Sequence, residues 1–428
     1  MSRDICPPAD EAGFPRVLSL RHQADVVNRV LAKGLEVILP MVMRETGFDM
    51  WLVICQEDDL DPIFTTMMPM GSWCPILQML ILYDLGFGEG IERINLSMTD
   101  TGDLYEKPWK GRLHSEQWTM LREIIEARDP MRIGINIGSV EWATGGLTHN
   151  LYRQLVDCLP HKYVERLKSA EPLATRWLAT LTDEEIGLYE QIVKVAHALI
   201  AECYSTKAII PGVTTTDDLV WHYWQRSVGL GLSLAFRPFF DIVRSDEMKE
   251  KYGAVDNIIR PGDLIHCDVG IKYLHLNTDH QEWVYILRRG EEDAPRGLRM
   301  LMAEGNRLQC IYMSEFRQSL TGNELLGNIL ERAKKEKIPN PRVYSHSLGY
   351  FLHEPGPLIG LPWEQERCEG RGDVRLEYNY AFTMELSVEA PVPEWGGQVV
   401  QMGLEQDIVY TRNGCLPLDG RQTKFHLI

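Results

Sequence analysis

Acidic side chains placed inside apolar, strand-like segments are the feature that most restricts how this chain can fold. Asp268 lies within the run Leu264–Val269, which follows a Pro-Gly-Asp turn. Glu385 lies within a second such run, Ala381–Leu386. A carboxylate buried in a strand costs free energy unless a cation or hydrogen-bond partners compensate its charge. The fold must therefore bring partners to these acids, and a metal ion is one such partner.

A second aspartate follows Asp268 at a spacing that suits a hairpin. Asp279 lies eleven residues further on, immediately before another strand-like run at Glu282–Leu287. Two strands of a hairpin can bring both carboxylates to one face, about a side chain apart. At that distance the two charges repel and one acid takes up a proton, unless a metal holds both. For either residue alone, a solvated aspartate at a strand end is the alternative.

Three further side chains extend this pattern toward the C-terminus. Glu405 directly follows the residues Met402–Leu404, near the end of the chain. His346 and His353 lie seven residues apart around a glycine, with Glu-Pro directly after the second. Imidazole suits a transition metal, and a second imidazole nearby can donate to a substrate oxygen. A hydrogen-bonded structural histidine is the alternative for each.

The periodicity of the chain predicts two domains. Helix-period hydrophobic residues from about Arg21 to Met43, followed by a buried strand at Met50–Gln56, favour an α/β layer in the N-terminal part. A capping box at Thr182–Glu185 begins a second region. We expect a structural or oligomerisation domain at residues 1–175 and an α+β domain at 176–428. Further strands and helices of the second domain are expected at Gln398–Met402, Asp407–Tyr410, Arg296–Ser319 and Thr321–Glu336.

Charge and cysteine usage narrow the class of protein. The chain has 44 basic and 61 acidic side chains, and a net charge of −17 repels nucleic acid and anionic membranes. Its nine cysteines are scattered without a C-x-x-C pair, which favours reduced thiols in the cytoplasm over a disulfide scaffold or zinc knuckle. Its first 16 residues lack the apolar run of a signal peptide, and we expect no membrane span.

Residues 182–428 resemble the pita-bread metallopeptidases, which include methionine aminopeptidase, aminopeptidase P, prolidase and creatinase. The resemblance rests on the order of the motifs, which is D–(11)–D, then H-x-x-G-x-x-x-H-E, then E and E. The two-domain length resembles the aminopeptidase P and prolidase branch. This resemblance implies a C-terminal pita-bread catalytic domain after a creatinase-type α/β domain, and a homodimer. It also implies that two divalent metal ions are bound by Asp268, Asp279, His346, Glu385 and Glu405.

The same resemblance implies how such a site works. Asp279 and Glu405 bridge the two ions, and Glu385 also handles the proton of the attacking water, which the ions activate. His353 contacts the substrate near the scissile carbonyl. Four carboxylates and one imidazole form a hard ligand set that favours manganese, with zinc, cobalt or iron as alternatives. The expected substrate is a small peptide or amide, cleaved as by an Xaa-Pro aminopeptidase or dipeptidase.

Three positions depart from the proline-specific members of this family. Lys251 stands where an upstream substrate-binding histidine is expected, Arg342 replaces a histidine, and Gly403 replaces a frequent arginine. Lys251 and Arg342 are either solvated surface residues or pocket cations for a carboxylate-bearing substrate. These changes raise the alternative of a metal-dependent hydrolase or lyase of a non-peptide substrate. A binding protein on the same scaffold is disfavoured, because scaffolding relatives have typically lost ligands.

Overall fold

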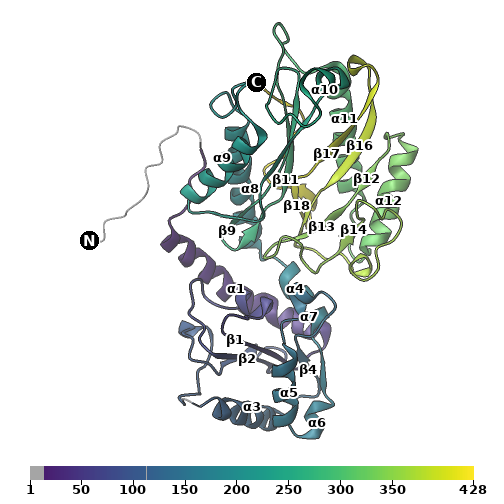
Figure 1. Cartoon of the computed structure of the whole chain (residues 1–428). Helices are drawn as coiled ribbons and strands as arrows, with labels where there is room; N and C mark the ends of the chain where they lie inside the picture. The colour runs from purple at the N-terminus through teal and green to yellow at the C-terminus, as the bar shows by residue number, and fades with distance from the viewer. Residues whose placement is uncertain (1–13, 112) are drawn as a thin grey trace. The chain divides into compact units, whose positions relative to one another are not determined.

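The computed structural model describes residues 14–111 and 113–428 (Figure 1). The chain forms two compact units. The first comprises Arg21–Thr182, and the second comprises Asp183–Ile428 together with the described residues up to Leu20. Cys6 and most of the segment compared with a signal peptide lie outside the described residues. No helix of the described chain is long and apolar enough to cross a membrane.

The N-terminal unit is an α/β layer, as predicted. Its sheet has the strand order β3-β2-β1-β4-β5. The strands are β1 (Met50–Gln56), β2 (Leu77–Asp84), β3 (Ile91–Asn95), β4 (Ile133–Ile135) and β5 (Leu167–Ser169). The helices are α1 (Leu20–Thr46), α2 (Pro62–Thr66), α3 (His114–Arg128), α4 (Glu141–Thr144), α5 (His149–Cys158), α6 (His161–Val164) and α7 (Glu171–Ala179). The predicted helix from about Arg21 to Met43 and the strand Met50–Gln56 are confirmed. A domain boundary at residue 175 would lie inside α7.

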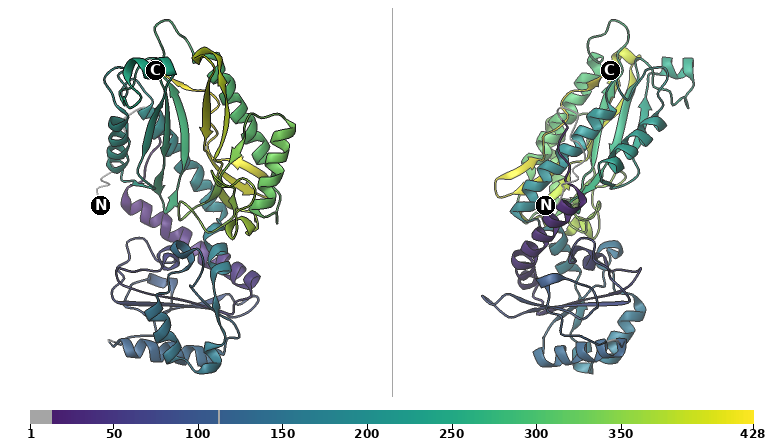
Figure 2. Two further views of the ribbon diagram at one scale, coloured as in Figure 1. Left: turned by 45° about the vertical axis from the view of Figure 1, so that its right-hand side comes forward. Right: turned by 90° about the vertical axis from the view of Figure 1, so that its left-hand side faces the viewer.

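The C-terminal unit contains two helix pairs and several sheets in which most strand pairs are antiparallel. Its helices are α8 (Asp183–Cys203), α9 (Thr216–Gly229), α10 (Asp246–Tyr252), α11 (Arg296–Glu315) and α12 (Gly322–Lys335). Reciprocal capping boxes begin two of them: Thr215 with Asp218 for α9, and Thr321 with Glu324 for α12. Within this unit α8 and α9 lie beside one set of strands, and α11 and α12 beside another (Figures 1 and 2).

Three of the sheets build the surroundings of the predicted site. A four-stranded sheet has the order β20-β11-β8-β7, a three-stranded sheet β12-β16-β17, and a five-stranded sheet β14-β13-β15-β18-β19. The strands of the first are β7 (Phe239–Val243), β8 (Leu264–Val269), β11 (His280–Tyr285) and β20 (His426–Leu427). The other two sheets comprise β12 (Arg342–Val343), β13 (Ser345–Leu348), β14 (Leu358–Ile359), β15 (Tyr380–Thr383), β16 (Leu386–Val392), β17 (Gln398–Leu404), β18 (Asp407–Thr411) and β19 (Gly414–Pro417). The short strands β6 (Ser233–Leu234), β9 (Ile271–Tyr273) and β10 (Leu276–Asn277) form a separate small sheet.

The prediction of one continuous strand at Ala381–Leu386 is wrong in one respect. β15 ends at Thr383 and β16 begins at Leu386, which leaves Met384 and Glu385 between them. β15 pairs with β13 and β18, whereas β16 pairs with β12 and β17. The chain therefore crosses from one sheet to another at this point, and Glu385 lies where the two sheets meet.

A buried ion pair fixes the start of β8. The guanidinium of Arg244 donates to both carboxylate oxygens of Asp263, at 2.9 Å and 2.6 Å. Both side chains are almost fully buried, and Arg244 also contacts Asp256 at 3.0 Å. The paired geometry compensates the cost of burying the charges. This pair positions the turn that precedes Asp268.

Candidate metal centre

Three of the predicted ligands meet in one buried cluster. Asp279, His346 and Glu405 each offer a ligand atom within 4.8 Å of the others. Nε2 of His346 lies 3.7 Å from Oδ2 of Asp279. The three residues come from different parts of the fold, since Asp279 precedes β11, His346 lies on β13 and Glu405 follows β17. Tertiary folding thus brings them together from distant points of the sequence.

Asp268 and Glu385 belong electrostatically to the same cluster. Burial raises the pKa of Asp268 to about 6. Burial, and then the charge of Asp268, raises the pKa of Asp279 well above its usual value and the pKa of Glu385 to about 8. Burial followed by the charges of Asp279 and Glu385 also raises the pKa of Glu405. The four acids therefore oppose one another's ionisation, as expected for carboxylates that lack a counter-charge.

The hydrogen bonding of these acids fits divalent cations. Oδ1 of Asp268, Oδ1 of Asp279 and Oε1 of Glu405 are buried and have no hydrogen-bond partner among the described residues. Buried polar atoms in folded proteins are normally satisfied, so three such oxygens in one cluster call for a partner. Burial, followed by the influence of His353, lowers the pKa of His346 to about 3, so the ring is neutral near pH 7. A neutral imidazole together with carboxylate oxygens is a donor set that can hold divalent metal ions.

His353 lies beside this cluster. Its ring centroid is 4.5 Å from that of His346, and the two rings meet edge to face. His353 follows β13 in the loop that leads to β14, and it is solvent-exposed. Burial of part of the ring and the nearby Arg371 lower its pKa. A neutral, accessible imidazole next to the cluster is suited to donate a hydrogen bond to a substrate oxygen.

Two side chains that contact the cluster were not singled out from the sequence. Gln281 donates from its amide nitrogen to Oε1 of Glu385 and to Oε2 of Glu405, the latter at 2.9 Å. Tyr344 lies near Glu385, and burial followed by the charge of Glu385 raises the pKa of the Tyr344 phenol. Gln281 follows Asp279 by two residues in the sequence, which is a signal for a shared strand face. Tyr344 has no local signal, because its backbone pairing with Glu385 arises only from the fold.

The two predicted pocket cations lie elsewhere on the surface of this unit. Lys251 is exposed at the end of α10, with its ammonium 4.9 Å from the ring centroid of Tyr252. Arg342 is exposed on β12 and donates to the carbonyl of Pro362 at 2.7 Å. Within the described ranges, neither residue makes a hydrogen bond or ion pair with the acidic cluster. These contacts favour the interpretation of both as solvated residues.

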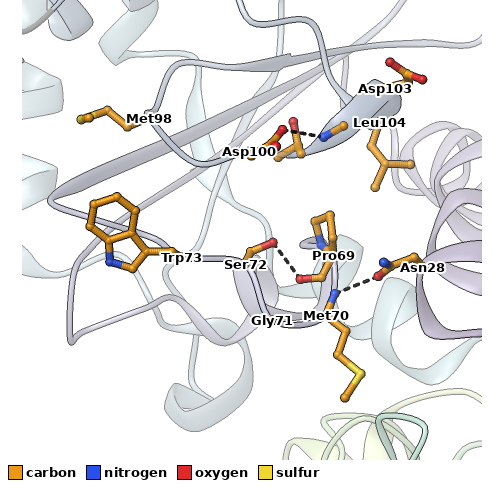
Figure 3. Close-up of a pocket in the computed structure, with 12 residues that line it drawn as sticks. Asn28, Pro69, Met70, Gly71, Ser72, Trp73, Met98, Asp100, Asp103 and Leu104 are labelled. Atoms are coloured by element: carbon orange, nitrogen blue, oxygen red, sulfur yellow. Dashed lines mark hydrogen bonds between the residues drawn. The ribbon is translucent and has the colours of Figure 1, made fainter. Parts of the chain in front are cut away.

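The N-terminal unit contains a groove of about 580 Å³ (Figure 3). Segments 69–73 and 98–104 line it together with Asn28, whose side-chain oxygen accepts from the backbone N–H of Met70 at 2.8 Å. Its acidic residues are Asp100 and Asp103, and no histidine or cysteine lines it. In the described part of the chain, the cluster around Asp279 is the one group arranged to hold a metal ion. The groove therefore adds no second metal centre.

Fold and site together define a two-domain α+β protein with a C-terminal pita-bread domain built around a buried carboxylate–histidine cluster. A family model described as "Metallopeptidase family M24" matches residues 188–412, which is more than half of the chain. The protein belongs to metallopeptidase family M24. This finding confirms the predicted family and fold class.

Solved structures extend the likeness to both units. An X-Pro aminopeptidase from Thermotoga maritima MSB8 has a TM-score of 0.63 at 15% identity, covering 91% of this chain and 100% of its own. An Xaa-Pro dipeptidase from Bacillus anthracis has a TM-score of 0.58 at 14% identity, and the match covers 95% of this chain and 100% of that one. The N-terminal domain of FACT complex subunit SPT16 from Cicer arietinum (chickpea) has a TM-score of 0.59 at 9% identity, and the match covers 93% of this chain and 98% of that one.

No curated protein matches this sequence. The structural likenesses, all at low identity, establish the shared fold. That fold is found both in proteins described as peptidases and in one described as a subunit of a complex. The activity of this chain therefore has to be argued from its site.

Proposed function

We propose that this protein is a dinuclear metal-dependent hydrolase that cleaves a peptide or amide bond in a small substrate, as an Xaa-Pro aminopeptidase or dipeptidase does. One observation carries the proposal. Three buried carboxylate oxygens, on Asp268, Asp279 and Glu405, lack hydrogen-bond partners in the described chain. They belong to the same cluster as the neutral His346. Burying unpaired carboxylates is costly, and a bound cation would compensate that cost.

The proposed ligands of the two ions, for which we favour manganese, are Asp268, Asp279, His346, Glu385 and Glu405. When bound, the ions would supply Lewis acidity and would lower the pKa of a bound water molecule. Glu385 would take a proton from the attacking water and return it to the leaving amine. Gln281 holds its carboxylate by a hydrogen bond from the side-chain amide. His353 would donate to the oxygen of the scissile carbonyl as negative charge develops there.

Metal analysis of the purified protein tests the centre directly. We expect about two manganese ions per chain after loading, and loss of metal in Asp279→Ala and Glu405→Ala. Asp246→Ala is the matched control, because this carboxylate is 68% exposed and pairs with Lys249 on the surface. Metal binding that is absent from the wild-type chain, or that persists unchanged in both ligand variants, would rule out the proposed centre.

The second candidate is a metal-dependent hydrolase or lyase of a non-peptide substrate on the same fold. Its support is the surface position of Lys251 and Arg342, together with the absence of a side chain at Gly403. The residues that replace the usual proline-pocket groups therefore do not rebuild that pocket. A panel of Ala-Pro, Gly-Pro, longer Xaa-Pro peptides and non-proline amides separates the two candidates. Cleavage of Xaa-Pro bonds favours the first, and failure of the manganese-loaded protein to cleave any peptide favours the second.

We further propose that the protein acts as a homodimer in the cytoplasm, without nucleic-acid or membrane partners. Eight cysteines in the described ranges are free thiols, a state that a reducing compartment maintains. The acidic surface, with a net charge of −17, disfavours binding to polyanions. Light scattering coupled to gel filtration tests the oligomer, and a monomeric mass at micromolar concentration would exclude the dimer.

A further inference from the structure

Gln281 connects two of the proposed ligands through one amide group. Its nitrogen donates to Oε1 of Glu385 and to Oε2 of Glu405, residues that are 104 and 124 positions away. Backbone bonds between Gln281 and Glu405 join the end of β17 to β11 at the same point. Gln281 occupies one oxygen of Glu405 and leaves the other, Oε1, without a partner in the described chain. The amide therefore selects which carboxylate oxygen faces the cluster.

The orientation of this amide is determined by a second contact. Because the amide nitrogen faces two carboxylates, Oε1 of Gln281 points to Nε2 of His266, at 3.0 Å. Nδ1 of His266 lies 3.1 Å from Oδ1 of Asp241, so the ring is held between an amide oxygen and a carboxylate. The indole of Trp283 packs on the same ring, with centroids 4.5 Å apart. When Nε2 of His266 carries a proton, it donates to Oε1 of Gln281 and keeps that oxygen turned away from the acids.

The pairing of β7, β8 and β11 places these residues in two adjacent rows on one sheet face. Asp241, His266 and Trp283 lie directly opposite one another in one row. Gln281 lies opposite Asp268 in the next row. His266 and Gln281 belong to neighbouring rows on this face, so the contact between them runs diagonally across the sheet. The strand register therefore builds this chain of contacts.

Gly403 provides the space that the amide of Gln281 occupies. A Cβ atom at position 403 would lie 2.9 Å from Oε1 of Gln281 and 3.9 Å from Nε2 of His266. Real Cβ atoms essentially never approach another heavy atom to less than 3.0 Å. The glycine is also held in place by the indole of Trp283, which donates to its carbonyl. A Cβ atom at position 403 would therefore require the amide oxygen of Gln281 to shift.

We propose that Gln281, His266 and Asp241 are positioning residues of the metal centre. Gln281 orients Glu385 and Glu405, His266 orients Gln281, and Asp241 orients His266. This inference rests on the proposed dinuclear function. It predicts that these three residues affect metal affinity without themselves binding metal.

Titration of the metal-free protein with manganese chloride, followed calorimetrically, measures the expected effect. Gln281→Leu retains much of the side-chain volume but removes the donor, and we expect the manganese affinity to fall about 10- to 100-fold, as for other groups that orient metal ligands. Gln422→Leu is the matched control. Gln422 is also buried, and it bonds only to the backbone of Trp283, so its loss should leave manganese affinity unchanged.

Two double-mutant cycles test whether the residues act in sequence. Gly403→Ala should weaken manganese binding in the wild-type background and have no further effect when combined with Gln281→Ala, which removes the clash. His266→Leu should likewise have no effect beyond that of Gln281→Leu. Circular dichroism of each variant establishes that the fold is retained.

The possible results are distinct. A wild-type chain that binds no manganese refutes the proposed function and this inference together. If Gln281→Leu binds manganese as tightly as the wild-type chain does, the proposed function stands and the positioning role is overturned. Additive effects in the cycles also overturn it, because they would show that His266 and Gly403 act independently of Gln281.

Discussion

Removal of metal should make the stability of this protein depend strongly on pH. Burial and the charge of Asp268 raise the pKa of Glu385 from its usual 4.5 to about 8 in the metal-free fold. Between these two pH values, the folded protein holds a proton that the unfolded chain has lost. The free energy of unfolding therefore falls as pH rises from about 4.5 to 8. Bound cations supply the missing counter-charge and should abolish this loss.

The magnitude follows from the same two values. At about 1.4 kcal/mol per pH unit, the difference between 4.5 and about 8 amounts to ~5 kcal/mol for Glu385. Asp268, raised from 3.8 to about 6, corresponds to ~3 kcal/mol by the same conversion. These two acids influence each other, so their contributions overlap. We therefore expect a total loss on the order of 5 kcal/mol between pH 5 and pH 8.

Calorimetric unfolding of chelator-treated protein at pH 5 and pH 8 provides the assay. Calorimetry can separate the transition of the C-terminal unit from that of the N-terminal unit, since a two-unit chain need not unfold in one step. Manganese added at pH 8 should restore the lost stability and release protons to the buffer. Glu385→Gln should reduce the pH dependence of the metal-free protein. Equal stability of metal-free wild type at both pH values would refute the reasoning.

Three further outcomes are expected. Arg244→Ala should destabilise the C-terminal unit by about 3–5 kcal/mol in urea unfolding, because it leaves Asp263 buried and unpaired. The control is Arg299→Ala, which removes an exposed ion pair and should change the free energy of unfolding by less than about 1 kcal/mol. Asp61→Ala should destabilise the N-terminal unit by about 1–2 kcal/mol, because the carboxylate caps α2, and an unchanged unfolding midpoint would contradict this. His353→Ala should lower kcat by about 10²- to 10³-fold with metal content unchanged, because it removes the donor to the substrate oxygen. Loss of metal from this variant would instead show that His353 is a metal ligand.

Many elements of the fold are predictable from local pattern. The strands Met50–Gln56 and Leu264–Val269 appear with the predicted bounds, because their apolar runs are enclosed by turn residues. The start of α12 follows from the capping box of Thr321. The break at Glu385 was not predictable in this way, since the residues on both sides are equally apolar. Only pairing with different partner strands separates β15 from β16.

The candidate site shows the same division. The sequence by itself determined the residue types, namely four acids in apolar surroundings and two histidines near a glycine, because burying a charge is costly wherever it occurs. The tertiary structure decided which groups stand around them. Strand register brought Gln281 to Glu385 and Glu405, the missing side chain of Gly403 left room for the amide of Gln281, and Lys251 was left on the surface. These outcomes depend on contacts between residues more than a hundred positions apart, for which local sequence carries no signal.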